Sequence, residues 1–454
     1  MSGQDTRGEA RRMLALAWPV VLTSLNWTLM HLIDVAVVGR AGTGELAALA
    51  ASRALTYVVI TFALAGLSGV LVFSARADGA GRLGDSGAVF RAGLVGGAAL
   101  GMMAAVLLEV GAARALALSG VAGDLVQPGA AVARAIGWAV PGSVVAFAAS
   151  YWLEGVSRPR RVLAVNLFTL PLNAALCVPL VHGWGPVAPM GAVGAGVATA
   201  IASTVGGVLM VLAALTCDRA GEAGLRRGDR RAWREAAAML PALARFGAVP
   251  AFGAALELVG FSVLIVLSTR FGDTSATAFQ AVFSLHNLVF GLALGFGSAA
   301  GVRVGNAVGA EDWGAVERRV TVAAALTVAV VAVPIAVFLL APDTVLAPLV
   351  PSDEGRALAA AMLLVLAPFM VFDGLQWVFV SALRSLGDQV AAGVNGVVGF
   401  FVVMAGSGWG LVALGFGPVA LAGAAAAGVV TVAALDAARL WAVVRRAELT
   451  RAAS

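Results

Sequence analysis

Charged residues are scarce in this 454-residue chain: they make up 12% of it, against 60% for hydrophobic residues. A soluble protein carries about a quarter charged residues, so the composition argues against a soluble fold. Lysine is missing altogether, and the net charge of +5 therefore rests on arginine. The arginines lie between apolar segments and do not form a basic face with interleaved aromatic residues, which argues against nucleic-acid binding.

Cysteine and histidine are also rare, with two and three copies. Cys177 and Cys217 provide neither a disulfide framework nor the spacing of metal ligands. No H-E-x-x-H, G-x-S-x-G or Walker A motif is present. We therefore predict that the protein is not an enzyme and needs no cofactor.

Long apolar runs, by contrast, recur along the whole chain. Runs of about 20 such residues are typical of transmembrane helices. We predict an all-α polytopic membrane protein with twelve transmembrane helices, the first of them retained and not a signal peptide. The expected spans are 13–38, 46–75, 88–110, 127–153, 161–183, 189–216, 239–268, 275–305, 317–341, 356–384, 390–413 and 417–443.

Twelve spans place both termini on one side of the membrane, and the arginines indicate which side. Of the 30 arginines, 24 lie at the termini, in the loops on that side or at its edge. The other six are Arg40, Arg53, Arg114, Arg134, Arg270 and Arg356. Since cytoplasmic loops carry the excess of Lys and Arg, both termini are predicted to be cytoplasmic.

The two halves of the chain repeat at an offset of about 230 residues. The matched pairs are Arg40 and Arg270, Gly42 and Gly272, Ser68 and Ser298, Gly79 and Gly309, Gly84 and Gly314, and, near that offset, Pro19 and Pro250, Pro141 and Pro368. An even number of spans per half makes the repeats parallel, which is a transporter architecture. We predict six-helix lobes at 1–216 and 239–454 around a central cleft. Residues 217–238 are predicted to form a solvated cytoplasmic linker with a short surface helix.

Three carboxylates interrupt the apolar spans: Asp34, Glu257 and Asp373. An acid at the centre of a membrane helix costs about 2.5–3.5 kcal/mol on insertion scales, so each is a functional hypothesis. Glu257 follows Arg245 by 12 residues and Asp373 precedes Arg384 by 11. At a rise of 1.5 Å per residue, both carboxylates lie about 17 Å from the cytoplasmic edge. A shared site for a cation or proton is geometrically possible, whereas Asp34 belongs to the outer half of the first lobe.

Polar and aromatic side chains share helix faces with these acids or stand on neighbouring spans. The candidates for lining the cleft are Asn26, Met30, Asn173, Gln280, Ser284, Asn287, Phe290, Gln376 and Trp377. Carboxylate, amide and hydroxyl oxygens suit a small hard cation, and carboxylates in a dry cleft also bind protons. His31 and His286 are expected to be packed or hydrogen-bonded. Glu154 and Asp436 are expected to form local ion pairs with Arg158 and Arg439.

Four stretches resemble the multidrug and toxic compound extrusion (MATE) family of transporters. They are LALAWPVVLTSLNWTLMHLIDVAVVGRAGTGELAALA in and after the first span, GAVGAGVATAIAS at 191–203, FGAVPAFGAALELV with the downstream GFGSAAGVRVGNAVGA, and DGLQWVFVSALRSLGD at 373–388. Acids at 34, 257 and 373 together are similar to the NorM-like branch of the family. Another branch has an Asp four residues after an Asn in span 5, where this chain has Asn173 and Cys177.

The resemblance implies a secondary active exporter that works by alternating access. It implies that small cationic or amphipathic compounds leave in exchange for H⁺ or Na⁺. Glu257 and Asp373, with Asp34, are the implied cation or proton sites, and Na⁺ is a candidate ligand of the first two. The protein is then expected to be a monomer, multi-pass in the inner membrane of a bacterium.

Two other transporter classes are alternatives. A major facilitator exporter also has two parallel six-helix halves, and the loop ADGAGRLGD at 77–85 is superficially similar to that superfamily's D-R-x-G-R loop. A lipid-linked oligosaccharide flippase of related fold is the other, although its cleft favours several arginines. An intramembrane enzyme or a scaffold is the remaining, disfavoured class.

Overall fold

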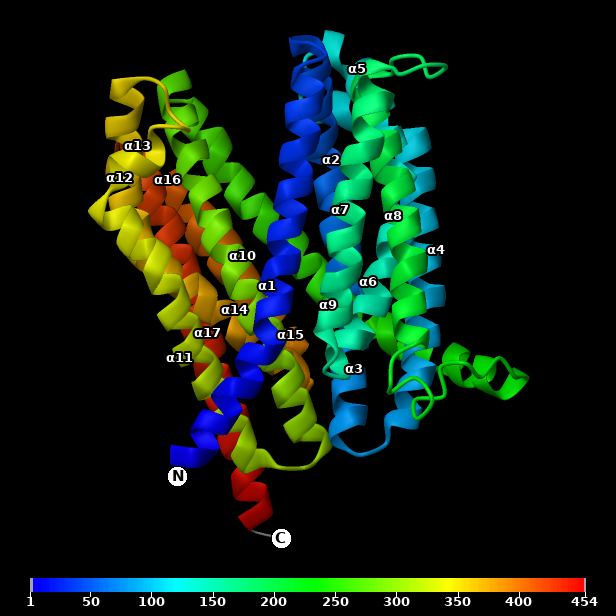
Figure 1. The fold of residues 1–454 in the computed structure, drawn as a ribbon. Helices are drawn as coiled ribbons and strands as arrows, with labels where there is room; N and C mark the ends of the chain where they lie inside the picture. The colour runs from blue at the N-terminus through cyan, green and yellow to red at the C-terminus, as the bar shows by residue number, and fades with distance from the viewer. Residues whose placement is uncertain (1–2, 453–454) are drawn as a thin grey trace. The chain divides into compact units, whose positions relative to one another are not determined.

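The computed structural model describes residues 3–452, and every long element in that range is a helix (Figure 1). In chain order the elements are α1 (Gly3–Gly39), α2 (Thr43–Gly66), α3 (Ser68–Gly79), α4 (Leu83–Leu118), α5 (Gly123–Gly137), α6 (Ala139–Gly155), α7 (Pro159–His182), α8 (Gly191–Leu215), α9 (Arg230–Thr269), α10 (Asp273–Gly309), α11 (Trp313–Leu340), α12 (Pro342–Leu346), α13 (Asp353–Leu366), the 3₁₀ turn η1 (Ala367–Phe369), α14 (Met370–Leu386), α15 (Gln389–Gly396), the π-helix η2 (Val397–Ala405), α16 (Gly406–Ala413) and α17 (Val419–Ala452). Within these residues, twelve helical stretches are long and apolar enough to cross a membrane. The predicted all-α polytopic fold is confirmed.

Several predicted spans consist of consecutive helices. The span expected at 127–153 changes from α5 to α6 at Trp138, and the span at 356–384 is interrupted by η1, which contains Pro368. Proline lacks an N–H and clashes with the carbonyl four residues earlier, and Gly137, four residues before Pro141, is the last residue of α5. The two prolines paired by the sequence repeat therefore lie at corresponding breaks.

The repeat also appears in the backbone at two glycines. Gly42 and Gly272 precede α2 and α10, and their φ angles are 142° and 92°. Side chains with a Cβ rarely adopt such angles, which explains glycine at both positions. The helical stretches that follow, Thr43–Gly79 and Asp273–Gly309, each contain 37 residues.

The helices form two compact units, and α1 and α9 are each divided between them. Unit 2 contains Leu22–Ala251, and unit 1 contains the described residues up to Val21 and from Phe252 onward. The first part of α1 thus belongs with the C-terminal helices, and the first part of α9 with the N-terminal ones. The lobes predicted at 1–216 and 239–454 stay a prediction.

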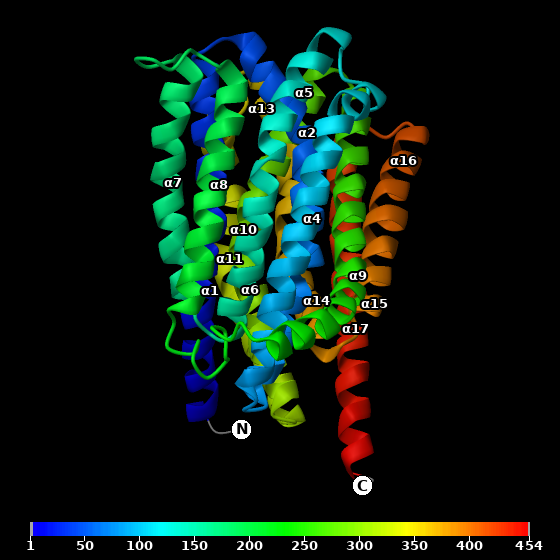
Figure 2. The ribbon, with the colours of Figure 1, turned by 90° about the vertical axis from the view of Figure 1, so that its right-hand side faces the viewer.

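Unit 2 contains α2 to α8, and its helices α7 and α8 run alongside each other (Figure 2). Trp152 of α6 is fully buried against Phe90 of α4, and its indole N–H donates to Ser86 over 3.1 Å. A buried indole needs such a partner for its N–H, so this contact combines apolar packing with a satisfied donor.

The linker between α8 and α9 is only partly solvated. Ala220, Ala223 and Leu225 are buried within unit 2. Arg219 Nη2 lies 2.5 Å from Asp78 Oδ1. The interpretation of 217–238 as a solvated stretch is therefore wrong for its first half, because small apolar residues between the charges dock onto the helix ends.

Arg158 and Asp218 form a more exposed ion pair beside that linker. Arg158 Nε donates to Asp218 Oδ1 over 2.9 Å, and this bond lowers the pKa of the Asp218 carboxyl from 3.8 to about 2. The pair's stabilisation is fully present above pH 3.8 and is lost as the pH falls through about 2. Since both side chains are solvent-exposed, we expect it to contribute at most about 1 kcal/mol.

Helices α2 and α9 approach closely at two glycines of unit 2. A Cβ added to Gly247 would lie 1.7 Å from the Gly66 carbonyl oxygen. Gly247→Ala is expected to destabilise the protein by about 1–3 kcal/mol, since overpacked helices must separate. Thermal unfolding of the purified protein in detergent measures this loss.

Gly253→Ala is the matched control, six residues later on the same helix. A Cβ there meets no atom within 4 Å. Alanine favours helix by about 1 kcal/mol over glycine, so this variant should melt at or above the wild-type temperature. Equal melting temperatures for the two variants would contradict the close contact.

In unit 1, a buried carboxylate joins the start of α1 to α10. Arg303 Nε and Nη2 donate to the two carboxylate oxygens of Glu9 over 2.6 and 2.7 Å. Arg319 Nε of α11 lies 3.9 Å from Glu9 Oε1. Glu9 is 4% exposed, so one carboxylate compensates two guanidinium groups away from water.

Candidate functional site

Asp373 lies on the first turn of α14 and is 2% exposed. A titratable neighbour is His286 of α10, whose Nε2 lies 3.1 Å from Asp373 Oδ2 without the alignment of a hydrogen bond. The other oxygen, Oδ1, has no hydrogen-bond partner among the described residues. A buried carboxylate with a free acceptor can bind a proton or a cation.

Glu257 stands on the part of α9 that belongs to unit 1. Asp373 is near enough to interact with it electrostatically as a like charge, and Arg384 as an opposite one. Because α9 and α14 are uninterrupted between each acid and its arginine, the helical rise between them is about 17 Å in both cases, and the depth in the membrane stays a prediction. These two predicted residues are brought together within one unit.

His286 also belongs to this site, although the sequence predicted only that it is packed or hydrogen-bonded. It is packed, as expected, with Phe261 at 5.3 Å and Phe283 at 6.0 Å between ring centroids. Its contact with Asp373 depends on the rotation of α10 against α14, which sequence spacing does not define. The sequence feature that could have indicated His286 is its position between Ser284 and Asn287, two residues predicted to line the cleft.

Two further predicted residues lie near Asp373 on α14. Gln376 is buried, and Trp377 packs edge-to-face on Phe290 of α10 with centroids 5.6 Å apart. A Cβ at Gly297 would lie 2.1 Å from Trp377 Cδ1, so glycine makes room for the indole. Arg384 also faces that ring, 5.2 Å from its centroid.

The polar stripe of α10 is exposed on unit 1. Gln280, Ser284 and Asn287 all have exposed side chains. Ser284 donates to the Gln280 carbonyl of its own helix over 2.9 Å. Their role in lining a cleft stays a prediction.

Asp34 lies in unit 2 and has a partner that the sequence did not assign. Arg53 Nη2 of α2 is 3.8 Å from Asp34 Oδ2 and donates to the His31 carbonyl over 3.2 Å. The Cys177 thiol of α7 also lies within hydrogen-bonding reach of Asp34. Asp34 is thus already beside a cation of the protein, whereas Asp373 is beside a histidine.

Other polar residues of unit 2 are buried near the same helices. Asn26 is 4% exposed, and Met30 is half-buried one turn later on α1. Asn173 is fully buried, and its amide donates to Thr199 of α8 over 3.3 Å. This bond gives Asn173 a structural partner and leaves Cys177, one turn on, against Asp34.

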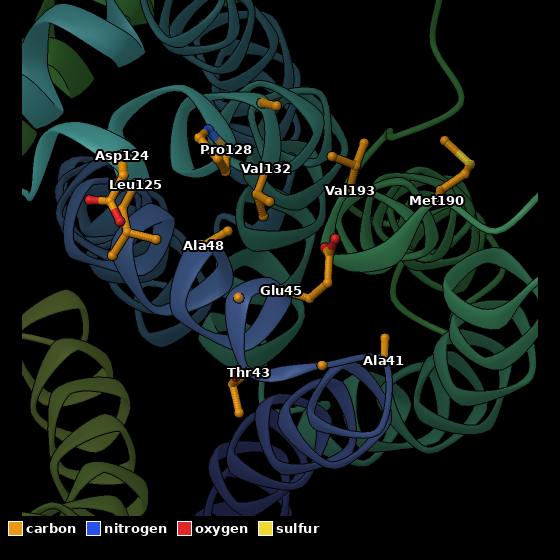
Figure 3. A pocket seen from close by; sticks show the side chains of 13 residues that line it. Ala41, Thr43, Glu45, Ala48, Asp124, Leu125, Pro128, Val132, Met190 and Val193 are labelled. Carbon is orange, nitrogen blue, oxygen red and sulfur yellow. The ribbon is translucent and has the colours of Figure 1, made fainter.

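A cavity of about 630 Å³ opens at one end of unit 2, where α2, α5 and α8 meet (Figure 3). Glu45 and Asp124 lie on its wall, and none of the predicted site residues does. Glu45 Oε2 accepts a hydrogen bond from the Ala192 backbone over 2.6 Å, so this carboxylate caps the start of α8. The cavity is therefore separate from the carboxylates of the membrane spans.

A bound cation at Glu257 and Asp373 would need oxygens beyond the two carboxylates. Among the side chains that the structure describes, no group of three or more His, Cys, Asp or Glu residues is arranged to hold a metal ion. Na⁺ would have to draw on amide or backbone oxygens as well, whereas a proton requires one carboxylate oxygen.

Two stretches of the chain match the same family model. The MatE family model aligns with residues 19–178 and again with 251–409. The second match begins 232 residues after the first, close to the offset of the sequence repeat. Together the two matches cover more than half of the chain.

The chain belongs to the MatE family. A probable multidrug resistance protein NorM of Bradyrhizobium diazoefficiens is 30% identical over 399 residues, which are 86% of this chain and 84% of that protein. A protein of the same name in Deinococcus radiodurans is 32% identical over 416 residues, 89% of this chain and 88% of that one. The predicted likeness to the NorM branch is confirmed.

Solved structures agree on the fold of this MatE protein. A crystal structure of the eukaryotic MATE transporter AtDTX14 superposes with a TM-score of 0.87 at 17% identity, covering 97% of this chain and 98% of that one. An outward-facing multidrug resistance MATE family transporter has a TM-score of 0.83 at 18% identity, with 97% of each chain covered. At such identities the likeness concerns the fold alone.

Family membership decides several of the predictions. MatE proteins are transporters that need no cofactor, so the chain is not an enzyme. Twelve apolar helices and bacterial NorM relatives make it a multi-pass protein of the inner membrane. A major facilitator exporter is excluded.

Proposed function

We propose that this MatE protein exports cationic or amphipathic drugs and toxic compounds in exchange for H⁺ or Na⁺. The observation that carries the proposal is the pair Glu257 and Asp373, two carboxylates of unit 1 that are near enough to interact and that the sequence predicts at matched depth. Relatives named as probable multidrug resistance proteins support the substrate class. The protein works as a monomer with both termini in the cytoplasm.

The coupling depends on the charge of these carboxylates. An ion entering from outside neutralises Glu257 and Asp373, and the cationic substrate then loses its counter-charge and leaves outward. In the reverse state, the ionised pair attracts substrate from the cytoplasm. Each charge moved through 100 mV supplies about 2.3 kcal/mol, so one or two ions sustain a useful gradient.

The buried environment favours such an exchange. Two like charges in a medium of low dielectric constant repel each other strongly, so loading one positive charge relieves that repulsion. Trp377 and Phe290 supply an aromatic surface beside Asp373, and aromatic faces attract organic cations.

Ethidium efflux from proteoliposomes tests the function and identifies the ion. We expect ethidium to be moved against its own concentration gradient when a pH or a Na⁺ difference is imposed across the membrane. Transport should stop when the ion gradient that drives it is collapsed. An uncoupler abolishes H⁺-driven export, and replacing Na⁺ abolishes Na⁺-driven export. Failure of both gradients, with movement of a lipid-linked oligosaccharide instead, would favour the flippase.

A further inference from the structure

Asp436 of α17 is a buried acid to which the proposed transport step assigns no role. It lies in the membrane-spanning stretch Val419–Ala447 and is 0% exposed. The predicted ion pair with Arg439 is wrong, because Arg439 Nε donates to Asp388 Oδ2 over 2.6 Å. A carboxylate held in a membrane span without a salt bridge to Arg439 is costly unless it has a function.

The neighbour of Asp436 is an amide. Asn395 Nδ2 of α15 donates to Asp436 Oδ1 over 2.8 Å, and Oδ2 has no hydrogen-bond partner in the described part of the chain. The amide therefore presents its donor, and not its oxygen, to the carboxylate. The unpartnered Oδ2 can take a proton, whereas a metal cation requires several oxygens around it.

Close packing holds this pair together. The π-helix η2 begins two residues after Asn395, and a Cβ at its Gly399 would lie 2.1 Å from the Val432 side chain of α17. Val432 is one turn before Asp436. The approach of η2 to α17 therefore positions Asn395 against the carboxylate, and π-helical turns are frequent at functional sites.

Arg384 connects Asp436 with the candidate transport site. This guanidinium acts electrostatically on Asp436 and also on Glu257, each as an opposite charge. The other charged residues on or beside the elements packed against α17 are Asp373, Asp388, Glu317, Arg318, Arg319, Asp353, Glu354 and Arg356. Two carboxylates in unit 1 thus depend on one shared arginine.

We propose that Asp436 is a second proton-binding carboxylate of unit 1, linked through Arg384 to Glu257. This rests on the proposed exchange at Glu257 and Asp373. Asp436 takes a proton from water to become a carboxylic acid and returns it to water, and no other bond changes. Because ionised Glu257 draws on the same arginine, a proton that leaves Glu257 favours proton uptake at Asp436, and the coupling is reciprocal.

Infrared difference spectra of the protein in lipid nanodiscs, recorded over a series of pH values, test the binding site. In the triple variant Asp34→Asn/Glu257→Gln/Asp373→Asn, a titrating carboxylic-acid carbonyl band should remain. Adding Asp436→Asn should remove it, whereas adding Asp388→Asn, at the Arg439 ion pair, should leave it. A band that survives Asp436→Asn would overturn the inference.

The link through Arg384 is tested by the midpoint of that band. Arg384→Gln should move the midpoint to higher pH, since the ionised form of Asp436 loses an opposite charge. Asn395→Ala should move it in the same direction by removing a hydrogen bond, and this variant also serves if Asp436→Asn does not fold. An unchanged midpoint in both variants would overturn the link.

Transport separates this inference from the proposed function. Asp436→Asn should shift the pH dependence of ethidium efflux. A wild-type pH profile in Asp436→Asn, together with loss of transport in Glu257→Gln, would overturn the inference alone. Full transport in Glu257→Gln would overturn the proposed function and leave the Asp436 band standing.

Discussion

Glu257→Gln and Asp373→Asn are each expected to reduce gradient-driven ethidium export to the level of vesicles without protein. The amide keeps the shape of the carboxyl group but can carry no negative charge, so neither ion nor substrate is attracted. The loss should exceed that of any other single substitution considered for this chain, because the two carboxylates act as one unit. Initial efflux rates in proteoliposomes, normalised to the amount of inserted protein, measure it.

Matched controls come from acids in the loop region before α14. Asp343→Asn and Glu354→Gln make the same chemical changes at exposed positions of α12 and α13. Both should export at the wild-type rate. If Glu257→Gln and Asp373→Asn also transport fully while folding normally, the assignment of these carboxylates to ion coupling is wrong.

Glu9→Gln is expected to destabilise the protein by about 3–5 kcal/mol, the usual cost of removing one partner of a buried ion pair. Arg303 and Arg319 would then face each other without a carboxylate between them. Unfolding in detergent, followed by circular dichroism against temperature or denaturant, measures the change. The start of α1 should lose its attachment to α10 first.

Asp218→Asn serves as the comparison, because it breaks an exposed ion pair with Arg158. There we expect at most about 1 kcal/mol. The double variant Glu9→Gln/Arg303→Gln should recover part of the loss, since it removes the uncompensated charge together with its partner. Equal effects of Glu9→Gln and Asp218→Asn would mean that the Glu9 carboxylate is well hydrated.

Much of the fold was predictable because the bilayer acts on local properties of the chain. Apolar length predicts a span wherever it occurs, and the glycines before α2 and α10 indicate the repeat because few other residues adopt their φ angles. The linker was the exception. Its charges predict a solvated linker, but Ala220 and Ala223 are buried against a surface of helix ends that only the folded unit provides.

The same difference between local properties and tertiary contacts applies to the candidate site. Glu257 and Asp373 could be predicted, since an acid in an apolar run is costly wherever the helix packs. Their partners could not. His286 lies beside Asp373, and Arg53 lies beside Asp34. Arg439 donates to Asp388 and not to Asp436.

The sequence by itself determined the number of spans, the repeat, the MatE family and the acids at membrane depth. Only the tertiary structure decided which side chain stands beside each acid. The physical reason is that successive side chains of a helix point in directions about 100° apart. Which of them faces a neighbouring helix therefore depends on the rotation of the helix about its axis, and contacts between helices determine that rotation. Gly297 beneath Trp377 and Gly399 against α17 are such contacts, and they place His286 and Asn395 beside the two buried aspartates.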